Sequence, residues 1–499
     1  MHSAREPYHH RRWMWAVLAL AIAVRVFALA DKPFWRDEAW VAEQVASPLS
    51  AGLAQPRAVP IGFVAVTQAL GALPLAPEIA YRLLPLVTGI ALLPLLGALA
   101  AALGATPPVP LVVMWLAAGM PALVYYSREL KSYGLDALLA ALLPLLALHF
   151  FGRAAGQPQR RPAIAGAILL VVLAAAPWIT FGALFAIAAV LAWGWLAWWW
   201  RATPSARCWW GLASAVYVAS FGLAYRVTLG AQTDNPRLRT AWQGHLLQEV
   251  SPSLLAQTAT AVERYASIAV TYVFPTVWPL AVPLLLIGLL TWPRAWRGYV
   301  AWLCLATAAI AVVAAVADRY LLAAGRLLLF AAPALLLCAA AGLSSTARRL
   351  SPRRGPTVAV AAAAALALIW SGLAVAHRLP PYHNDRNDYF YYDILHDVPA
   401  LLDAAGSIIP PGEPLYVAQY ASRPFAWYAH GRFAAAKVCR EPCNPNDTAG
   451  WWLESWHGRA WMIVVDDENG LVAEQLTRHG AVATTRLKTR GVELWEVHR

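Results

Sequence analysis

The chain has 499 residues, of which 60% are hydrophobic and 13% are charged. Because soluble domains carry about a quarter charged residues, this composition excludes a soluble globular protein. Lys and Arg number 39 against 27 Asp and Glu, a formal net charge of +12. Such an excess fits a nucleic-acid partner, an anionic membrane surface or unequal charge on the two sides of a bilayer, and its distribution along the chain distinguishes these cases.

Apolar runs that are long enough to cross a bilayer recur along most of the chain. A hydrocarbon core of about 30 Å takes roughly 20 helical residues. We count eleven such runs: Trp13–Leu29, Ile79–Ala102, Pro108–Tyr126, Tyr133–Phe151, Pro162–Trp178, Thr180–Trp200, Trp209–Leu229, Ile268–Leu290, Tyr299–Val316, Leu327–Leu343 and Val358–Ala376. They predict an α-helical polytopic membrane domain of about eleven transmembrane helices over residues 1–377. Residues 61–76 are also apolar, but they are short and are expected to lie on the membrane, since a twelfth crossing would reverse everything downstream.

The positive charges lie between these runs on one side only. If the N-terminus is cytoplasmic, the inside segments hold fourteen arginines and a single acid, Glu6, whereas the rest of the chain holds 25 basic and 26 acidic residues. The positive-inside rule therefore accounts for the whole excess, and no nucleic-acid partner follows from it. We expect a multi-pass protein of the inner (cytoplasmic) membrane with a cytoplasmic N-terminus. Three regions then lie outside: residues 31–78, 231–265 and 378–499.

The last of these regions has the mixed composition of a small α/β domain. Within residues 378–499 we expect strands over 415–420 and 461–465, helices over 393–408 and 471–479, and a hairpin over 486–497. About 120 residues suffice for one small core. This domain is expected to be extracytoplasmic.

Two of the five cysteines, Cys439 and Cys443, lie in this domain within the sequence CREPC. An oxidising compartment would permit a short-loop disulfide between them. A metal site would need further ligands nearby, and His430 and His457 are weak candidates.

Three groups of ionisable residues fall at the outer ends of the predicted helices. The first is the adjacent pair Asp37 and Glu38, just after the first run. A carboxylate there suits the deprotonation of an acceptor hydroxyl, or the binding of a divalent cation against a phosphate leaving group. The alternative is a solvated interfacial pair that balances Lys32 and Arg36.

The second group follows the third run and contains Arg128, Glu129, Lys131, Tyr133 and Asp136. In a helix that starts near Arg128, the spacings of four and three place Glu129, Tyr133 and Asp136 on one face. Ionisable groups near the membrane core tend to be functional. The alternative is a network of ion pairs that ties helices together.

The third group comprises Tyr320, in the sequence Asp318-Arg319-Tyr320, and Arg326 at the next helix start. The planar donor fork of arginine suits phosphate. Arg25 and Arg82 lie near outer helix ends too, with snorkelling as the ordinary explanation.

Four segments together resemble the glycosyltransferase-C superfamily, specifically the bacterial multi-spanning enzymes similar to protein O-mannosyltransferases and lipid A aminoarabinose transferases. They are DEAW after the first run, IAYRLLPLVTGIALLPLL, SRELKSYGLDALL and GRLLLFAAPALLLCAAAGL. The resemblance covers residues 13–376, and the order and sidedness of the segments agree with it.

The resemblance implies a polyprenyl-phosphate-linked sugar donor, transfer on the outer face, and a catalytic base in the first outer loop. Carried over by position, Asp37 is the base with Glu38 beside it, and Glu129, Lys131 and Tyr133 match the second family motif. Arg128 stands where the family often has Gln, and Lys131 where it has Arg, which affects bidentate phosphate binding. The Pro-Pro element of the first loop is reduced to Val59-Pro60-Ile61-Gly62.

In this scheme Lys131 and Arg326 hold the phosphate. Trp242 and His245, in the outer loop 231–265, either cover the sugar or anchor the loop at the interface. The acceptor is a lipid, a polysaccharide or a protein, and a divalent cation is allowed without being required.

The sequence therefore favours a membrane glycosyltransferase. The chief alternative is a transporter or flippase of a lipid-linked saccharide, which should show internal repeats and broken midplane helices. In a third hypothesis the membrane part is a scaffold and the outer domain is a binding module.

Overall fold

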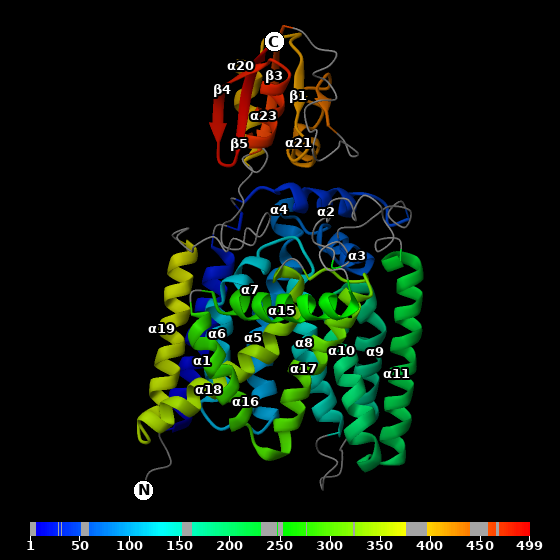
Figure 1. The fold of residues 1–499 in the computed structure, drawn as a ribbon, viewed down its shortest axis with the longest axis vertical. Coiled ribbons are helices and arrows are strands. Elements are labelled where there is room, and N and C mark those ends of the chain that lie inside the picture. The colour runs from blue at the N-terminus through cyan, green and yellow to red at the C-terminus, as the bar shows by residue number, and fades with distance from the viewer. Residues whose placement is uncertain are drawn as a thin grey trace.

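The computed structural model describes residues 6–27, 29–30, 32–50, 59–151, 162–230, 247, 253–275, 277–322, 325–375, 397–439, 458–465 and 469–499. A bundle of long helices forms one part of the molecule, and a smaller α/β domain is seated at one end of it (Figure 1).

The bundle is built from the apolar runs of the sequence. Its helices are α1 (Glu6–Val26), α5 (Leu83–Ala102), α6 (Val109–Gly119), α8 (Tyr133–Phe151), α9 (Pro162–Ile179), α10 (Ala183–Trp193), α11 (Pro204–Ala224), α16 (Trp278–Thr291), α17 (Arg294–Val316), α18 (Ala332–Leu350) and α19 (Gly355–Val375). Among the described residues, seven helical stretches are long and apolar enough to cross a membrane, or eight if one bent pair is a single span. The polytopic helical fold is thus confirmed, whereas the count of eleven crossings stays a prediction.

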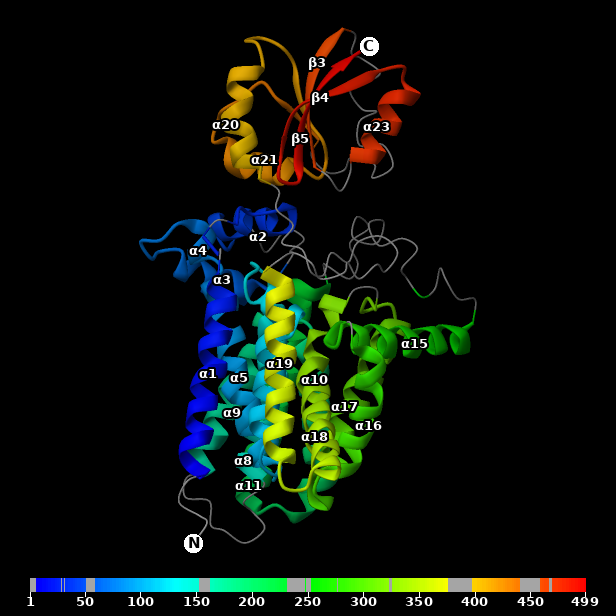
Figure 2. The same ribbon diagram turned by 90° about the vertical axis from the view of Figure 1, so that its left-hand side faces the viewer.

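One predicted crossing, Ile268–Leu290, is wrong as a continuous helix. Its first part belongs to α15 (Leu254–Val273), which lies across the end of the bundle (Figure 2) and is bent by 103° from α16. Pro275 lies two residues after the end of α15, and a proline ring cannot continue an α-helix. The hydropathy of residues 268–290 does not show this turn because both sides of it are apolar.

The predicted run Pro108–Tyr126 is also divided, into α6 and α7 (Pro121–Tyr126). Pro121 has no N–H, so the carbonyl of Ala117 lacks its helical donor. The guanidinium group of Arg25 lies beside this break and donates to the carbonyls of Ala117 at 3.2 Å and Ala118 at 3.0 Å. Arg25 is fully buried. Its position therefore reflects this helix break, and the snorkelling explanation is wrong.

Three short helices cover the end of the bundle nearest the α/β domain: α2 (Arg36–Ala46), α3 (Ile61–Leu70) and α4 (Pro77–Ala80). The ten residues of α3 rise about 15 Å at 1.5 Å each, half of what a crossing needs. The helix is therefore shorter than a crossing needs, and the expectation that residues 61–76 lie on the membrane stays a prediction.

The C-terminal domain is a five-stranded sheet with helices on both faces. Its elements are α20 (Val398–Ile408), β1 (Leu415–Val417), α21 (Ser422–Ala429), β2 (Lys437–Val438), β3 (Arg459–Val465), α23 (Asn469–Arg478), β4 (Val482–Thr489) and β5 (Val492–His498). The strand order is β2-β1-β3-β5-β4, parallel from β2 to β3 and antiparallel from β3 to β4. The α/β assignment and the hairpin at Gly491, with φ of 72°, are confirmed.

This domain shares a hydrophobic core with the short helices at the end of the bundle. One buried cluster joins Phe34, Val45 and Phe63 to Leu401 and Phe425. Figures 1 and 2 show α21 as the part of the domain that faces α2. The C-terminal domain is therefore packed on α2 and its neighbours through apolar side chains.

The two ends of the bundle differ in charge. α1 starts at the end opposite the C-terminal domain, and the turns from α10 to α11, from α16 to α17 and from α18 to α19 lie at that same end (Figure 1). These turns and the adjoining helix ends carry Arg201, Arg207, Arg294, Arg297, Arg348, Arg349, Arg353 and Arg354. The arginines therefore gather opposite the C-terminal domain, in agreement with the predicted relative sidedness.

Candidate functional site

Asp37 lies in the first turn of α2 and brings the three ionisable groups of the sequence together. Its Oδ2 atom lies 3.7 Å from Nζ of Lys131 and 3.6 Å from Nη1 of Arg326. Lys131 belongs to the turn between α7 and α8, and Arg326 to the 3₁₀ helix η5 (Gly325–Ala331). Segments that are far apart in the chain thus meet at one carboxylate, whose side chain is 22% exposed.

The charges around Asp37 keep it ionised. Desolvation alone would raise its pKa, but the positive charges of Lys131, Arg326, Arg36 and Arg423 outweigh this and hold the pKa below its usual value. An ionised carboxylate between two cations, open in part to the outside, is a suitable proton acceptor beside an anion-binding group.

Glu38, the neighbour of Asp37, has a different environment. Both of its carboxylate oxygens accept hydrogen bonds from Arg82, at 2.8 and 2.6 Å, and Oε1 also accepts the Leu130 N–H at 2.8 Å. Burial would raise the pKa of Glu38, but Arg82 and Lys32 lower it below its usual value. Through these bonds Glu38 ties α2 to α5 and to the turn before α8. A role for Glu38 as a second catalytic carboxylate stays a prediction.

Glu129 is a buried carboxyl group beside these residues. Its Oε1 atom accepts a hydrogen bond from Nε1 of Trp35 at 3.2 Å, and Oε2 has no hydrogen-bond partner among the residues that the structure describes. Burial, together with the charge of Glu38, raises the pKa of Glu129 to about 7, against the positive charges nearby. At neutral pH a substantial fraction of Glu129 thus carries a proton.

The structure gives Asp136 and Tyr320 structural roles. Oδ1 of Asp136 accepts the N–H groups of Gly182 at 3.0 Å and Ala183 at 3.2 Å, and the Thr180 hydroxyl as well, so it caps the start of α10. The hydroxyl of Tyr320 donates to the Leu327 carbonyl at 2.5 Å. The polar atoms of both residues are thus engaged within the protein, and their predicted contacts with substrate stay predictions.

Some of the remaining predicted residues lie in the described part of the chain and others lie outside it. Tyr133 starts α8, and its ring packs edge-on to Tyr126 with centroids 5.0 Å apart. Arg128 is buried in the same turn as Lys131. Trp242, His245 and Cys443 lie outside the described residues, and Cys439 is disulfide-bonded. Sugar and phosphate contacts of Tyr133, Arg128, Trp242 and His245 stay predictions, as does the pairing of Cys439 with Cys443.

Nothing in the described part of the chain forms a group of three or more His, Cys, Asp or Glu side chains that could hold a metal ion. Asp37 faces Lys131 and Arg326, which would repel a cation. These residues therefore fit an anion better than the divalent cation that the sequence allowed.

Sequence reasoning missed the roles of Arg82, Lys32 and Trp35. Lys32 is buried with Nζ 4.7 Å from the ring centre of Tyr125, and Arg82 also donates to the Lys32 carbonyl at 2.6 Å. The charge of Arg82 near the start of an apolar run was a visible signal that this residue has a polar partner. Its partner Glu38, 44 positions away, could not be read from the sequence.

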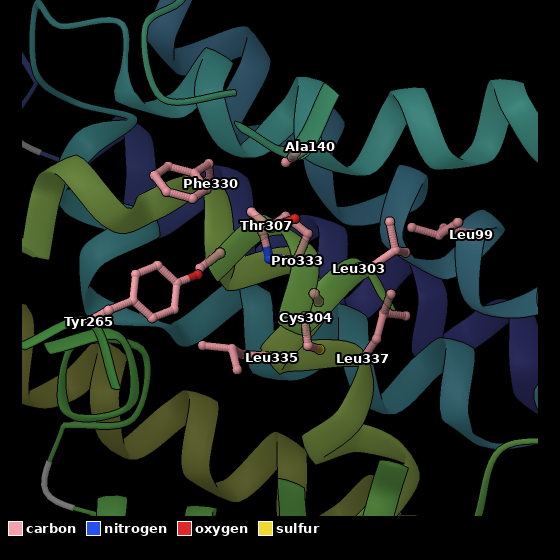
Figure 3. A pocket seen from close by; sticks show the side chains of 13 residues that line it. Leu99, Ala140, Tyr265, Leu303, Cys304, Thr307, Phe330, Pro333, Leu335 and Leu337 are labelled. Atoms are coloured by element: carbon pink, nitrogen blue, oxygen red, sulfur yellow. The ribbon is translucent and has the colours of Figure 1, made fainter. Parts of the chain in front are cut away.

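A largely apolar cavity lies among the helices of the bundle (Figure 3). Its lining includes Tyr265 of α15, Leu303 and Thr307 of α17, and Phe330 of η5. Because η5 carries both Phe330 and Arg326, one short helix connects the cavity wall to the charged site.

No family model and no curated protein matches the sequence. Among solved structures, the apo state of ArnT from Cupriavidus metallidurans is similar to this chain. The TM-score is 0.58 and the identity 12%, with coverage of 97% of this chain and 98% of that chain. For ArnT bound to undecaprenyl phosphate the TM-score is 0.57 and the identity 13%, with coverage of 97% of this chain and 98% of that chain. For the Archaeoglobus fulgidus oligosaccharyltransferase in complex with Zn and sulfate the TM-score is 0.50 and the identity 11%, with coverage of 85% of this chain and 62% of that chain.

These structures are glycosyltransferases of the glycosyltransferase-C type. The chain therefore has a glycosyltransferase-C fold, and the resemblance inferred from the sequence motifs is confirmed at the level of the fold. Its coverage of ArnT extends over both the bundle and the C-terminal domain.

Proposed function

We propose that the protein is an integral membrane glycosyltransferase that moves a sugar from a polyprenyl-phosphate donor to an acceptor hydroxyl. The observation that carries this proposal is the position of Asp37, which faces Lys131 at 3.7 Å and Arg326 at 3.6 Å. One carboxylate and two cations are the groups that sugar transfer from a lipid phosphate needs.

In the proposed reaction, Asp37 accepts the proton of the acceptor hydroxyl as its oxygen attacks the anomeric carbon. The bond between this carbon and the phosphate oxygen breaks, and the polyprenyl phosphate leaves with the electron pair. Lys131 and Arg326 stabilise the charge that develops on the phosphate. The low pKa of Asp37 means that the base is ionised before the acceptor binds.

The apolar cavity supports a lipid-linked donor. It is lined mainly by aliphatic and aromatic side chains (Figure 3). Phe330 in its wall belongs to η5, the short helix that carries Arg326, so an isoprenoid unit bound there would have its phosphate near the charged site. ArnT, which has this fold, was crystallised with undecaprenyl phosphate. We infer by analogy that a carrier of this kind serves here.

We further propose that transfer takes place on the extracytoplasmic side of the inner membrane. The arginine-rich turns lie at the opposite end of the bundle from Asp37, and the positive-inside rule places such turns in the cytoplasm. The acceptor is a lipid, a polysaccharide or a protein of the cell envelope.

The test is Asp37→Asn in purified protein reconstituted in liposomes. Synthetic pentosyl and hexosyl polyprenyl phosphates with labelled sugar serve as donors, and an envelope extract serves as acceptor. We expect a loss of transfer of about 100-fold or more, since general-base catalysis contributes about 10²–10⁴-fold. Asp403→Asn is the matched control, because Asp403 is 70% exposed in the C-terminal domain and pairs with Arg432.

Two outcomes would contradict the proposal. Full transfer by Asp37→Asn would exclude Asp37 as the base. Movement of the labelled lipid across the membrane by the unaltered protein, without formation of a new glycosidic product, would favour the transporter instead.

A further inference from the structure

The start of α2, which carries Asp37, is held by the C-terminal domain. α2 has no side-chain cap of its own at its N-terminus. The hydroxyl of Tyr428, in α21, accepts the backbone N–H of Phe34 at 2.7 Å and donates to Oε1 of Glu78 at 3.0 Å. A residue 394 positions along the chain thus fixes the backbone just before α2.

The Phe34 side chain is held from the same direction. Its ring stacks on Tyr81 at 6.1 Å and lies edge-on to Trp427 of α21 at 5.7 Å between ring centres. Phe34 is fully buried. Backbone and side chain together therefore have little freedom to move while α21 stays in place.

Further along α2, the C-terminal domain makes two more contacts. Nη1 of Arg423 lies 2.9 Å from Oε2 of Glu43, and its guanidinium group lies over the ring of Trp40 at 4.7 Å. The guanidinium group of Arg36, the residue before Asp37, lies 3.9 Å from the ring centre of Tyr420. The contacts with segment 420–428 therefore occur on both sides of Asp37 in the sequence.

We propose that the C-terminal domain is a positioning element of the active site and that Tyr428 is its principal positioning residue. The distances from Asp37 to Lys131 and Arg326 are already 3.7 and 3.6 Å, so a small shift of α2 separates these charges. This inference rests on the proposed function of Asp37. It gives the domain a role in the reaction itself and replaces the hypothesis of an independent binding module.

The test compares Tyr428→Phe with the unaltered full-length protein in lipid nanodiscs. Phenylalanine keeps the ring in the shared core and removes only the hydroxyl that joins Phe34 to Glu78. Hydrogen exchange of peptides that contain Phe34 and α2 is the first measurement, and we expect faster exchange. The second is sugar transfer, for which we expect kcat to fall about ten-fold or more, since a misplacement of about 1 Å can cost ~100-fold.

The donor KM should stay unchanged, because Tyr428 is not part of the phosphate site. Arg432→Gln is the control: Arg432 lies in the same domain, pairs with Asp403 at 2.6 Å and is 47% exposed. It should alter neither the exchange of α2 nor kcat.

The two measurements separate this inference from the proposed function. Unchanged exchange in Tyr428→Phe would overturn the positioning role, whatever the activity. Faster exchange with an unaltered kcat would show that the position of α2 is not coupled to transfer, which also overturns it. If the unaltered protein transfers no sugar while exchange rises in Tyr428→Phe, the proposed function fails but the hold of the C-terminal domain on α2 stands.

Discussion

Glu38 and Arg82 form a fully buried ion pair in which one guanidinium group donates to both carboxylate oxygens. Asp37, the adjacent residue, is 22% exposed and faces two cations at longer distances. Successive positions on a helix point in different directions, so one carboxylate is directed into the protein and the other to the site. Two acids that are equivalent in the sequence therefore have separate roles.

The first prediction concerns these two carboxylates. Glu38→Gln should lower the thermal unfolding temperature strongly, because removal of one partner leaves the Arg82 charge buried, at a cost of about 3–5 kcal/mol. Asp37→Asn should lower it less, since Asp37 is partly exposed and its ion pairs are longer than that of Glu38. Differential scanning fluorimetry of the purified proteins measures both. Equal unfolding temperatures for the two variants would contradict the assignment.

The apolar runs and the positive-inside rule predict that Asp37, Lys131 and Arg326 lie at the same end of the bundle, and the structure brings the three side chains together. The sequence could not show which of the acidic side chains are hydrogen-bonded or ion-paired within the protein. Asp136 caps α10 through Gly182, 46 positions away, and Glu38 pairs with Arg82, so tertiary contacts alone decide their roles.

The second prediction concerns the pH dependence that Glu129 introduces. An unfolded glutamate ionises near pH 4.3, whereas the pKa of Glu129 in the folded protein is about 7. Below about pH 4 both states are protonated and Glu129 has no effect on stability. As pH rises to 7 the unfolded state loses its proton first, so Glu129 increasingly favours unfolding, and this penalty is complete above pH 7.

Glu129→Gln removes the penalty. The unfolding temperature of this variant, relative to the unaltered protein, should therefore rise between pH 4.5 and 7 and level off above that range, since the amide does not titrate. Glu474→Gln is a control, because Glu474 is exposed in α23. A constant difference across this pH range would show that the folded pKa of Glu129 is not raised.

The third prediction separates a cap from a substrate contact at Asp136. Asp136→Ala should destabilise the protein by about 0.5–2 kcal/mol, because the Gly182 N–H loses its acceptor and the Ala183 N–H keeps only the Thr180 hydroxyl. Asp136→Asn keeps an oxygen acceptor and should restore most of the unfolding temperature. Neither change should alter the donor KM. A large rise in the donor KM for the Asn variant would return Asp136 to the substrate site.

The C-terminal domain illustrates a second limit of sequence reasoning. The predicted strands over 415–420 and 461–465 and the hairpin around Gly491 are present, whereas β2 was not predicted. The contact of this domain with α2 depends on Tyr428, Arg423 and Trp427, which lie in the short helix α21 and carry no motif. Aromatic and basic residues of this kind are common on domain surfaces, so only the folded structure shows which helix they meet.

The fourth prediction concerns the crossing of α16 and α18, where two glycines let the backbones approach. A Cβ atom on Gly288 would lie 1.8 Å from the Cys338 carbonyl oxygen, and one on Gly342 would lie 1.9 Å from the Leu284 carbonyl oxygen. These contacts are with backbone, so no side-chain rotation relieves them and the helices must separate. Small residues four apart, such as Cys338 and Gly342, are typical of closely packed membrane helices.

Gly288→Ala should therefore lower the unfolding temperature, by an amount that corresponds to about 1–3 kcal/mol or more for an overpacked contact. Gly372→Ala in α19 is the matched control, because no atom lies within 4 Å of the added Cβ, and alanine is favoured over glycine in a helix by up to about 1 kcal/mol. The control should be neutral or stabilising.

The close crossing of α16 and α18 also affects the position of η5, because η5 precedes α18 directly. Gly288→Ala should therefore lower sugar transfer along with stability. A Gly288→Ala variant as stable as the control would show that α16 and α18 can separate without cost, and the close backbone contact would then have no part in holding Arg326 near Asp37.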